Sequence, residues 1–274
     1  LTSYTVRGDS EKEVMENCIP MIDGAYVDCD CIYIENEDTT SYVVFTALDT
    51  VPGGKSETLC VLGGGNGVYC SENNFYALDI NGKQQTQITA FSLNGTDIKY
   101  KTRGVIEGEA TNQYFYDEYN GYLRVATTCY NYKKQKSVSS IHILNSELKE
   151  VSCIEDIAND ESVKSARFMG DVGYVVTFRE TDPLFTLDLS DPYNPKIAGE
   201  LKLPGFSNYL HPLPGGLLLG FGYDGDSDDA DYNSVKVSLF DISDINNPKE
   251  LDSFVMKNAD TEMHYDARAL LYNE

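Results

Sequence analysis

A repeated unit of four short β-type runs constrains the fold of this chain more than any other feature of its sequence. One copy lies between Lys164 and Pro214, where four runs rich in Val, Tyr, Phe and Leu alternate with a Gly-Asp turn, a short loop and a Ser-Asp-Pro turn. β-Branched and aromatic residues favour strands, whereas Gly, Asp, Ser and Pro favour tight turns. The order of strand, tight turn, strand, loop, strand, turn and strand predicts one four-stranded antiparallel meander.

The same unit recurs along most of the chain. Its third run ends in an aliphatic residue before Asp, Asn or Ser, and these aliphatic residues are Leu48, Leu93, Leu144, Leu189 and Ile242, at intervals of 45, 51, 45 and 53 residues. Turn residues precede the last four copies at Asn73-Asn74, Asn120-Gly121, Gly170-Asp171 and Gly215-Gly216. Four strands per period of about 45–50 residues are typical of a β-propeller, in which each meander buries its faces against its neighbours. A β-sandwich, the alternative, does not repeat fixed four-strand units.

We therefore predict an all-β fold, a β-propeller of four-stranded antiparallel blades, with four whole blades and a partial blade at each end. The whole blades are predicted at residues 67–108, 113–155, 165–203 and 208–255. Residues 32–34, 42–48 and 57–62 would form the N-terminal partial blade, and residues 267–271 an inner strand at the C-terminal end. Residues 1–40 show no clear period and are predicted as an irregular lead-in to a single propeller domain at 41–274.

Charge and hydrophobicity exclude two classes of partner. The 44 acidic and 21 basic residues give a net charge of −23, which disfavours binding to a nucleic-acid backbone because that needs a basic face. No apolar run approaches the roughly 18 residues needed to span a membrane. Such acidity favours solubility, and it also suits divalent cations or an extracellular setting.

Three segments resemble a known family. They are ATNQYFYDEYNGYLRVATT, the run from VKSARFMG to SNYLHPL, and VSLFDISDINNPKELDSFVM. They look like the secreted bacterial and archaeal β-propeller domain family, which is distantly related to WD repeats. The resemblance runs from about Thr40 to the C-terminus and is specific between Gln113 and Pro214. It implies an extracellular or cell-surface protein, further blades before Leu1, and no activity that could be assigned to particular residues.

An acidic loop is the candidate metal site. Asp224, Asp226 and Asp228 stand at alternate positions, as carboxylates often do in loops that bind Ca²⁺. The EF-hand pattern fails, because Asp229 stands where the loop needs Gly and Val235 where it needs a bidentate Glu. A solvated loop and a Ca²⁺ site of another kind both remain open, so the sequence predicts no certain cofactor and leaves Ca²⁺ as the one candidate.

Tyr209, His211 and Arg167 are the candidates for contact with a ligand. Tyr209 and His211 lie on a predicted first strand, which lines the central channel of a propeller. Arg167 recurs with Arg124 and Arg179 on the inner two strands of successive blades, where an arginine either pairs with a carboxylate and ties blades together or binds an anionic ligand. Because the three histidines fall in different blades and no Cys/His motif joins them, we expect no zinc site.

The seven cysteines are read either as small buried hydrophobes or as one or two disulfides with at least one thiol left over. No catalytic motif stands out: G-x-S-x-G is absent, and no carboxylate pair is singled out among the many acidic residues. We therefore expect a non-catalytic extracellular propeller that binds a protein or glycan partner. The alternative is a propeller enzyme acting on polysaccharide or peptide.

Two outcomes are open for the ring. The chain is either an arc of a larger propeller, which associates with its missing blades or with another chain, or a five-bladed ring closed by pairing strands from its two ends. Residues 267–271 are the inner strand on which such closure depends. The arc is the outcome that the family resemblance favours.

Overall fold

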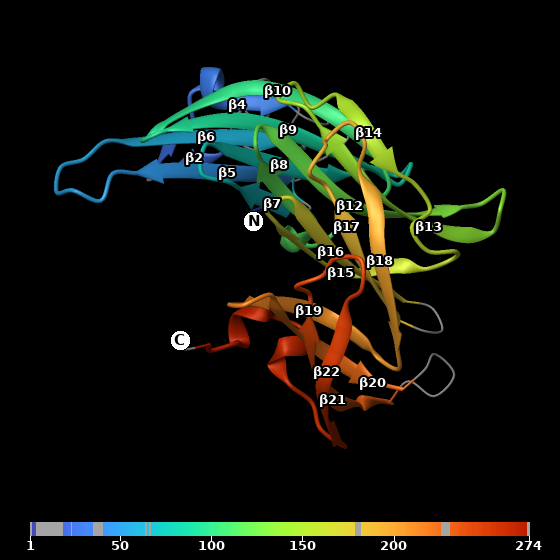
Figure 1. The fold of residues 1–274 in the computed structure, drawn as a ribbon. Helices are drawn as coiled ribbons and strands as arrows, with labels where there is room; N and C mark the ends of the chain where they lie inside the picture. The colour runs from blue at the N-terminus through green and yellow to red at the C-terminus, as the bar shows by residue number, and fades with distance from the viewer. Residues whose placement is uncertain are drawn as a thin grey trace. The chain divides into compact units, whose positions relative to one another are not determined.

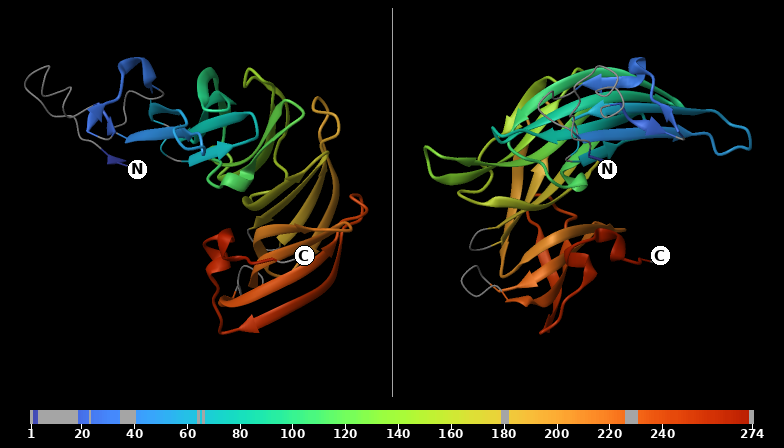
Figure 2. Two further views of the ribbon diagram at one scale, coloured as in Figure 1. Left: turned by 90° about the vertical axis from the view of Figure 1, so that its left-hand side faces the viewer. Right: turned by 180° about the vertical axis from the view of Figure 1, so that it is seen from behind.

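The computed structural model describes residues 2–3, 19–22, 24–34, 41–63, 65, 67–178, 182–225 and 231–272. Within these ranges the fold is all-β, and the helical elements are four 3₁₀ turns of three residues each. The chain divides into two compact units: unit 1 comprises residues 1–113 and 147–149, and unit 2 comprises residues 114–146 and 150–274. Figure 1 traces the strands of both units, and Figure 2 shows them from two further sides.

Unit 1 begins with a four-stranded sheet that is not a simple meander. Its order is β1-β5-β6-β4, and the strands are β1 (Thr2–Ser3), β4 (Ile32–Ile34), β5 (Ser41–Leu48) and β6 (Ser56–Leu62). The three predicted strands of the N-terminal partial blade are all present. The sequence did not indicate that β4 pairs parallel to β6, or that β1 joins from the predicted lead-in. Two other short strands, β2 (Met21–Ile22) and β3 (Ala25–Tyr26), precede the turn η1 (Cys29–Cys31).

The second sheet of unit 1 is a regular meander. Its strands are β7 (Gly67–Cys70), β8 (Asn74–Ile80), β9 (Gln85–Asn94) and β10 (Asp97–Glu107). Phe91 of β9 is fully buried and meets the ring of Tyr33 edge-on, with 5.3 Å between ring centroids. Leu59 and Val61 of β6 belong to the same apolar cluster. The N-terminal sheet therefore packs on this meander as a blade would, although its connectivity differs.

Unit 2 contains three consecutive antiparallel meanders, as predicted (Figure 1). The turn η2 (Gln113–Phe115) precedes the first of them. The first sheet comprises β11 (Tyr116–Tyr119), β12 (Tyr122–Asn131), β13 (Lys136–Leu144) and β14 (Glu150–Ile154). The second comprises β15 (Ser162–Met169), β16 (Val172–Phe178), β17 (Asp182–Asp188) and β18 (Lys196–Leu203). The third comprises β19 (Phe206–Leu213), β20 (Leu217–Asp224), β21 (Asp231–Asp241) and β22 (Lys249–Lys257).

Turn residues set the hairpins at the predicted places. Asn120 and Gly121 join β11 to β12 with φ values of 51° and 80°, and Gly215 and Gly216 join β19 to β20 with 80° and 75°. Two successive positive φ values fit the right-handed twist of paired strands, and Asn and Gly adopt them at low cost. The hairpin signals in the sequence therefore predicted the true turn positions.

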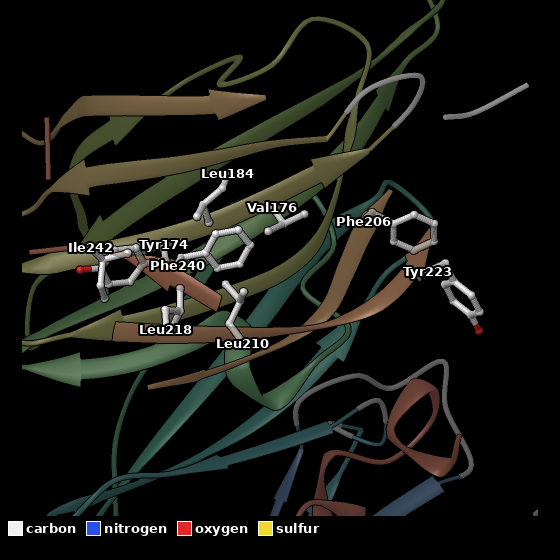
Figure 3. Close-up of a cluster of buried hydrophobic side chains, with 9 residues drawn as sticks. All are labelled: Tyr174, Val176, Leu184, Phe206, Leu210, Leu218, Tyr223, Phe240 and Ile242. Atoms are coloured by element: carbon white, nitrogen blue, oxygen red, sulfur yellow. The ribbon is translucent and has the colours of Figure 1, made fainter. Parts of the chain in front are cut away.

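An apolar cluster joins the last two sheets of unit 2 (Figure 3). Tyr174 and Val176 of β16 face Leu210 of β19 and Leu218 of β20, and all four side chains are buried. Burial of side chains on this scale is the main term that stabilises stacked sheets. The first strands β15 and β19 are thereby held side by side, which brings their inner residues together.

One strand prediction is wrong. Residues 267–271 form no strand; instead Ala267–Ala269 is the 3₁₀ turn η4, and Glu262–His264 before it is the turn η3. Asp266 caps η4 by accepting a hydrogen bond from the backbone N–H of Arg268, and it also pairs with the Arg268 guanidinium. The inner strand predicted for the C-terminal partial blade is therefore a 3₁₀ turn in the described residues. None of the described helical turns is long and apolar enough to cross a membrane.

Candidate ligand-binding site

The structure brings together the three residues that the sequence selected for ligand contact. Arg167 lies on β15, and Tyr209 and His211 lie on β19, the neighbouring first strand in unit 2. The Tyr209 hydroxyl lies 3.3 Å from Nδ1 of His211, within hydrogen-bonding distance. All three therefore belong to one surface built on two inner strands.

Two further tyrosines complete this surface. The Arg167 guanidinium lies over the ring of Tyr114, 5.3 Å from its centroid, and the rings of Tyr114 and Tyr209 are 5.2 Å apart. Tyr272, near the C-terminus, places its ring 5.3 Å from that of His211. We call Tyr114, Arg167, Tyr209, His211 and Tyr272 the tyrosine–arginine cluster. Nothing in the sequence distinguished Tyr114 and Tyr272 from the other tyrosines, because neither lies in the repeated strands.

The environment of the cluster fixes its protonation states. Burial raises the pKa of Tyr209, with the Arg167 charge acting against it and Tyr114 adding to it. Burial, and then the Arg167 charge, lowers the pKa of His211. At neutral pH Tyr209 is therefore a neutral phenol and His211 a neutral imidazole, so Arg167 carries the charge among these three side chains.

Arg167 makes no hydrogen bond or ion pair with any residue in the part of the chain that the structure describes. Its contact with Tyr114 is a cation–π interaction, which leaves the N–H groups at the edge of the guanidinium without an acceptor. Arg167 is half-buried. A guanidinium in this position can donate hydrogen bonds to an oxygen atom of a ligand.

Arg124 shows the other arrangement that the sequence allowed. It is 3% exposed, donates from Nε to Oδ2 of Asp117 at 2.9 Å, and donates from Nη1 to the carbonyl of Gly170 at 2.5 Å. It thus ties the first sheet of unit 2 to the β15–β16 turn of the second. Arg179, the third arginine of the pattern, falls outside the described residues.

One of the three candidate carboxylates of the acidic loop, that of Asp224, lies within the described residues. Asp224 ends β20, and its N–H donates to Oγ of Ser234 at 2.9 Å. Asp226 and Asp228 lie outside the described residues, so the Ca²⁺ site remains a prediction. Within the described residues no cysteine forms a disulfide, and Cys60 is fully buried, in keeping with a small hydrophobe.

A profile of the β-propeller domain family matches residues 2–274 of the chain. The chain belongs to this family. An uncharacterized protein of Methanocaldococcus jannaschii is 41% identical over 192 residues, which cover 70% of this chain and 29% of that protein. An uncharacterized protein of Archaeoglobus fulgidus is 41% identical over 188 residues, covering 69% and 28%. The chain thus spans less than a third of the length of these curated relatives.

Solved structures resemble the chain at low identity. The cobalt-substituted Synechocystis ACO has a TM-score of 0.48 at 13% identity, over 80% of this chain and 56% of that one. The β-propeller domain of the trilobed protease from Pyrococcus furiosus has a TM-score of 0.40 at 12% identity, over 68% and 56%. Nothing about activity follows from likenesses of this size.

Proposed function

We propose that this β-propeller is a non-catalytic extracellular module that binds a protein or glycan partner through the tyrosine–arginine cluster. One observation carries the proposal: Arg167 holds a half-buried guanidinium among aromatic rings and has no hydrogen-bond acceptor among the described residues. Elsewhere in the same unit, Arg124 shows that this chain supplies a carboxylate where an arginine serves the scaffold.

The chemistry of the cluster indicates what it would bind. A guanidinium binds carboxylates in a bidentate manner and does so more strongly than it binds neutral acceptors. Tyrosine offers a rigid apolar ring with a polar tip, and tyrosine and arginine are the residues enriched at binding hot spots. The matching ligand carries a carboxylate next to an apolar face, as a uronic acid sugar or an acidic peptide with a neighbouring hydrophobic residue does.

The net charge of −23 is compatible with this ligand because the recognition is local. Charges more than about 8–10 Å apart at the surface are largely screened at physiological salt. The overall acidity slows the approach of a small anionic ligand without preventing its binding. It opposes the binding of extended polyanions such as nucleic acid, because these meet many of the negative charges at once. The extracellular setting forms part of the proposal and rests on the family resemblance.

The enzyme alternative has weaker support in the described residues. Asp266, in the C-terminal segment that also carries Tyr272, pairs with Arg268, and hydrogen bonds from Arg268 lower its pKa to about 2. It is therefore a poor proton donor near neutral pH. A pocket of about 110 Å³ at Tyr119, Arg124 and Pro192 contains one carboxylate, Asp171, whereas glycoside cleavage needs a pair.

The test begins with the purified chain on two arrays, one of glycans with and without carboxylate groups and one of peptides. Titration calorimetry on the best ligand then compares the parent with Arg167→Met and Tyr272→Ala. Tyr132→Ala is the matched control, because Tyr132 is also an exposed tyrosine, at 75%, but lies outside the cluster. We expect each cluster variant to weaken binding about tenfold or more, and the control to leave binding unchanged.

Two results would overturn the proposal. Binding that survives both Arg167→Met and Tyr272→Ala would place the ligand elsewhere on the chain. Turnover of an array polysaccharide or peptide by the purified chain would establish the enzyme alternative. In either case the folded state of each variant is checked by its thermal unfolding.

A further inference from the structure

Three side chains that commonly ligate metals converge in the first sheet of unit 2, away from the tyrosine–arginine cluster. They are His142 of β13 and Glu150 and Cys153 of β14, and their ligand atoms all lie within 4.8 Å of one another. Nδ1 of His142 is 2.6 Å from Oε2 of Glu150 and 3.6 Å from Sγ of Cys153. No sequence motif joins His142 to a cysteine, but strand pairing places His142 directly opposite Cys153.

The same positions of the other meanders in unit 2 hold different residues. In the second sheet Phe185 pairs with Glu200, and in the third sheet Ser238 pairs with Ser253. These positions correspond because their partners on the second strand stand at the same distance from the hairpin turn in each sheet. The partners are Val125, Val175 and Gly220. The propeller fold itself thus has no need of a histidine and a cysteine here, and the group is a property of this one sheet.

The distances suit a tetrahedral metal ion. Zinc lies about 2.0–2.1 Å from a histidine nitrogen and about 2.3 Å from a thiolate sulfur, so the two ligand atoms are about 3.6 Å apart at a tetrahedral angle. The distance between Nδ1 of His142 and Sγ of Cys153 is 3.6 Å. In a tetrahedral zinc site the nitrogen and oxygen ligand atoms are about 3.4 Å apart. Oε2 of Glu150 would therefore have to move less than about 1 Å away from Nδ1 of His142. The Glu150 side chain is 46% exposed and has room to do so.

The other nitrogen of His142 has the support that a metal ligand requires. Nε2 lies 3.0 Å from Oγ1 of Thr127, which is 1% exposed. A hydroxyl can both donate and accept, so Thr127 can accept a hydrogen bond from Nε2–H once Nδ1 binds a metal. Such a partner fixes the ring and its tautomer, as the outer-shell residues of metal sites do.

Charge gives a reason for a cation at this place. The thiol of Cys153 and the carboxylate of Glu150 lie close together, with their ligand atoms and Nδ1 of His142 all within 4.8 Å of one another. A thiolate beside the Glu150 carboxylate would place two negative charges next to each other. A divalent cation cancels both, which favours loss of the thiol proton on binding.

We propose that Nδ1 of His142, Sγ of Cys153 and Oε2 of Glu150 bind one thiophilic divalent cation, with Zn²⁺ as the best match. A nitrogen, a sulfur and an oxygen ligand select zinc over Ca²⁺ or Mg²⁺, which prefer oxygen alone. Three protein ligands and the exposure of Glu150 leave a fourth position for water or another ligand. On binding, the Cys153 thiol releases its proton to solvent, and the imidazole carries its proton on Nε2, next to Thr127.

The test is titration of the metal-stripped full chain with Zn²⁺ by calorimetry, with Co²⁺ absorption as a second readout. The background carries Cys29→Ser and Cys31→Ser, because these two thiols near the N-terminus could bind metal by themselves. We expect one equivalent of Zn²⁺ per chain, release of about one proton at pH 7, and a thiolate-to-cobalt band in the near ultraviolet. Ca²⁺ should not compete.

Variants separate this site from adventitious binding. Cys153→Ser and His142→Phe, which installs the residue that the second sheet carries at this position, should abolish the one-equivalent site and the cobalt band. Cys129→Ser, another half-buried cysteine in the same sheet, is the matched control and should change neither. Thr127→Val should weaken Zn²⁺ binding about 10–100-fold.

Two outcomes overturn the proposal. One is the absence of stoichiometric Zn²⁺ binding by a chain whose circular dichroism shows it folded. The other is a site that persists in Cys153→Ser, the near-isosteric variant that is expected to fold even where His142→Phe does not. Neither outcome bears on the tyrosine–arginine cluster, which shares no residue with this group.

Discussion

Arg124 and Arg167 occupy the inner strands of neighbouring sheets in unit 2, yet their surroundings differ. Arg124 is nearly inaccessible, with a carboxylate and a backbone carbonyl as acceptors. Arg167 lies half-buried against Tyr114 and has no such acceptor within the described ranges. The partners of the two arginines therefore differ, and so do their places in the repeat, because Arg167 stands on the first strand of its hairpin and Arg124 on the second strand of its own.

Hairpin register explains the difference. Asp117 stands directly opposite Arg124 in the β11–β12 pair, so an opposite charge faces the arginine across the strands. In the β15–β16 pair the residue opposite Arg167 is Tyr174, which is 3% exposed and packs in the apolar cluster between the sheets. The same hairpin geometry therefore gives one arginine a partner and leaves the other without one.

The largest effect is expected from Arg124→Met. It removes the cation from a buried pair and leaves Asp117 and the Gly170 carbonyl without their donor. Because the Asp117 side chain is 27% exposed, the loss in unfolding free energy should be roughly 3 kcal/mol, at the low end for a broken buried pair. Urea unfolding of parent and variant measures it.

A double substitution sharpens this result. Arg124→Met combined with Asp117→Leu removes both charges, and we expect it to regain part of the lost stability because no charge is left unpaired. If Arg124→Met alone unfolds at the same urea concentration as the parent, the pair contributes nothing to the scaffold. Arg124 and Arg167 would then differ in their hydrogen-bond partners but not in their contribution to the free energy of unfolding.

The sequence predicted most of the strands and the turns, and it placed Arg167, Tyr209 and His211 on inner strands, because these features depend on local patterns; the contact of these three residues with a ligand stays a prediction. Alternation and Asn-Gly or Gly-Gly pairs fix each hairpin, and the repeat then places successive first strands side by side. It could not predict contacts set by tertiary packing. Tyr114 and Tyr272 reach the cluster from outside the strands, Tyr114 from the turn η2 and Tyr272 from the C-terminal segment.

The grouping of His142 with Glu150 and Cys153 also could not be predicted from the sequence, because it depends on the register of two strands. An irregularity in the β13–β14 register between Ile143 and Leu144 changes which residues of the two strands face each other. A spacing rule applied along the chain cannot include such a shift. The strand predicted at residues 267–271 is wrong in a local way, because Ala267–Ala269 form a 3₁₀ turn that Asp266 caps.

Arg167→Met should have a much smaller effect on stability than Arg124→Met. No hydrogen bond or ion pair with a described residue is lost, and the methionine side chain can keep the contact with the Tyr114 ring. We expect the free energy of unfolding to change by no more than about 0.5 kcal/mol, as for substitutions away from structural features. A loss comparable to that of Arg124→Met in the same urea experiment would show that Arg167 also serves the scaffold.

The smallest effect is a shift in the titration of His211, followed by NMR of its ring protons. Burial is the first cause of its lowered pKa and the Arg167 charge the second, so Arg167→Met should raise the pKa but not restore it fully. His211→Asn identifies the signal, and the rings of His142 and His264 serve as internal references. An unchanged pKa would mean that the guanidinium does not reach the ring in solution.

The sign of the linked stability follows from the same shift. With a folded-state pKa below the ordinary value of about 6.5, the unfolded chain binds the proton more readily than the folded one. The stability that neutral His211 contributes is therefore present above pH of about 6.5 and is lost as the pH falls toward the folded-state pKa. In Arg167→Met the two pKa values lie closer together, so this part of the acid-side loss should shrink. A ligand carboxylate bound at Arg167 should act in the same direction, because it neutralises the charge that disfavours protonation of His211.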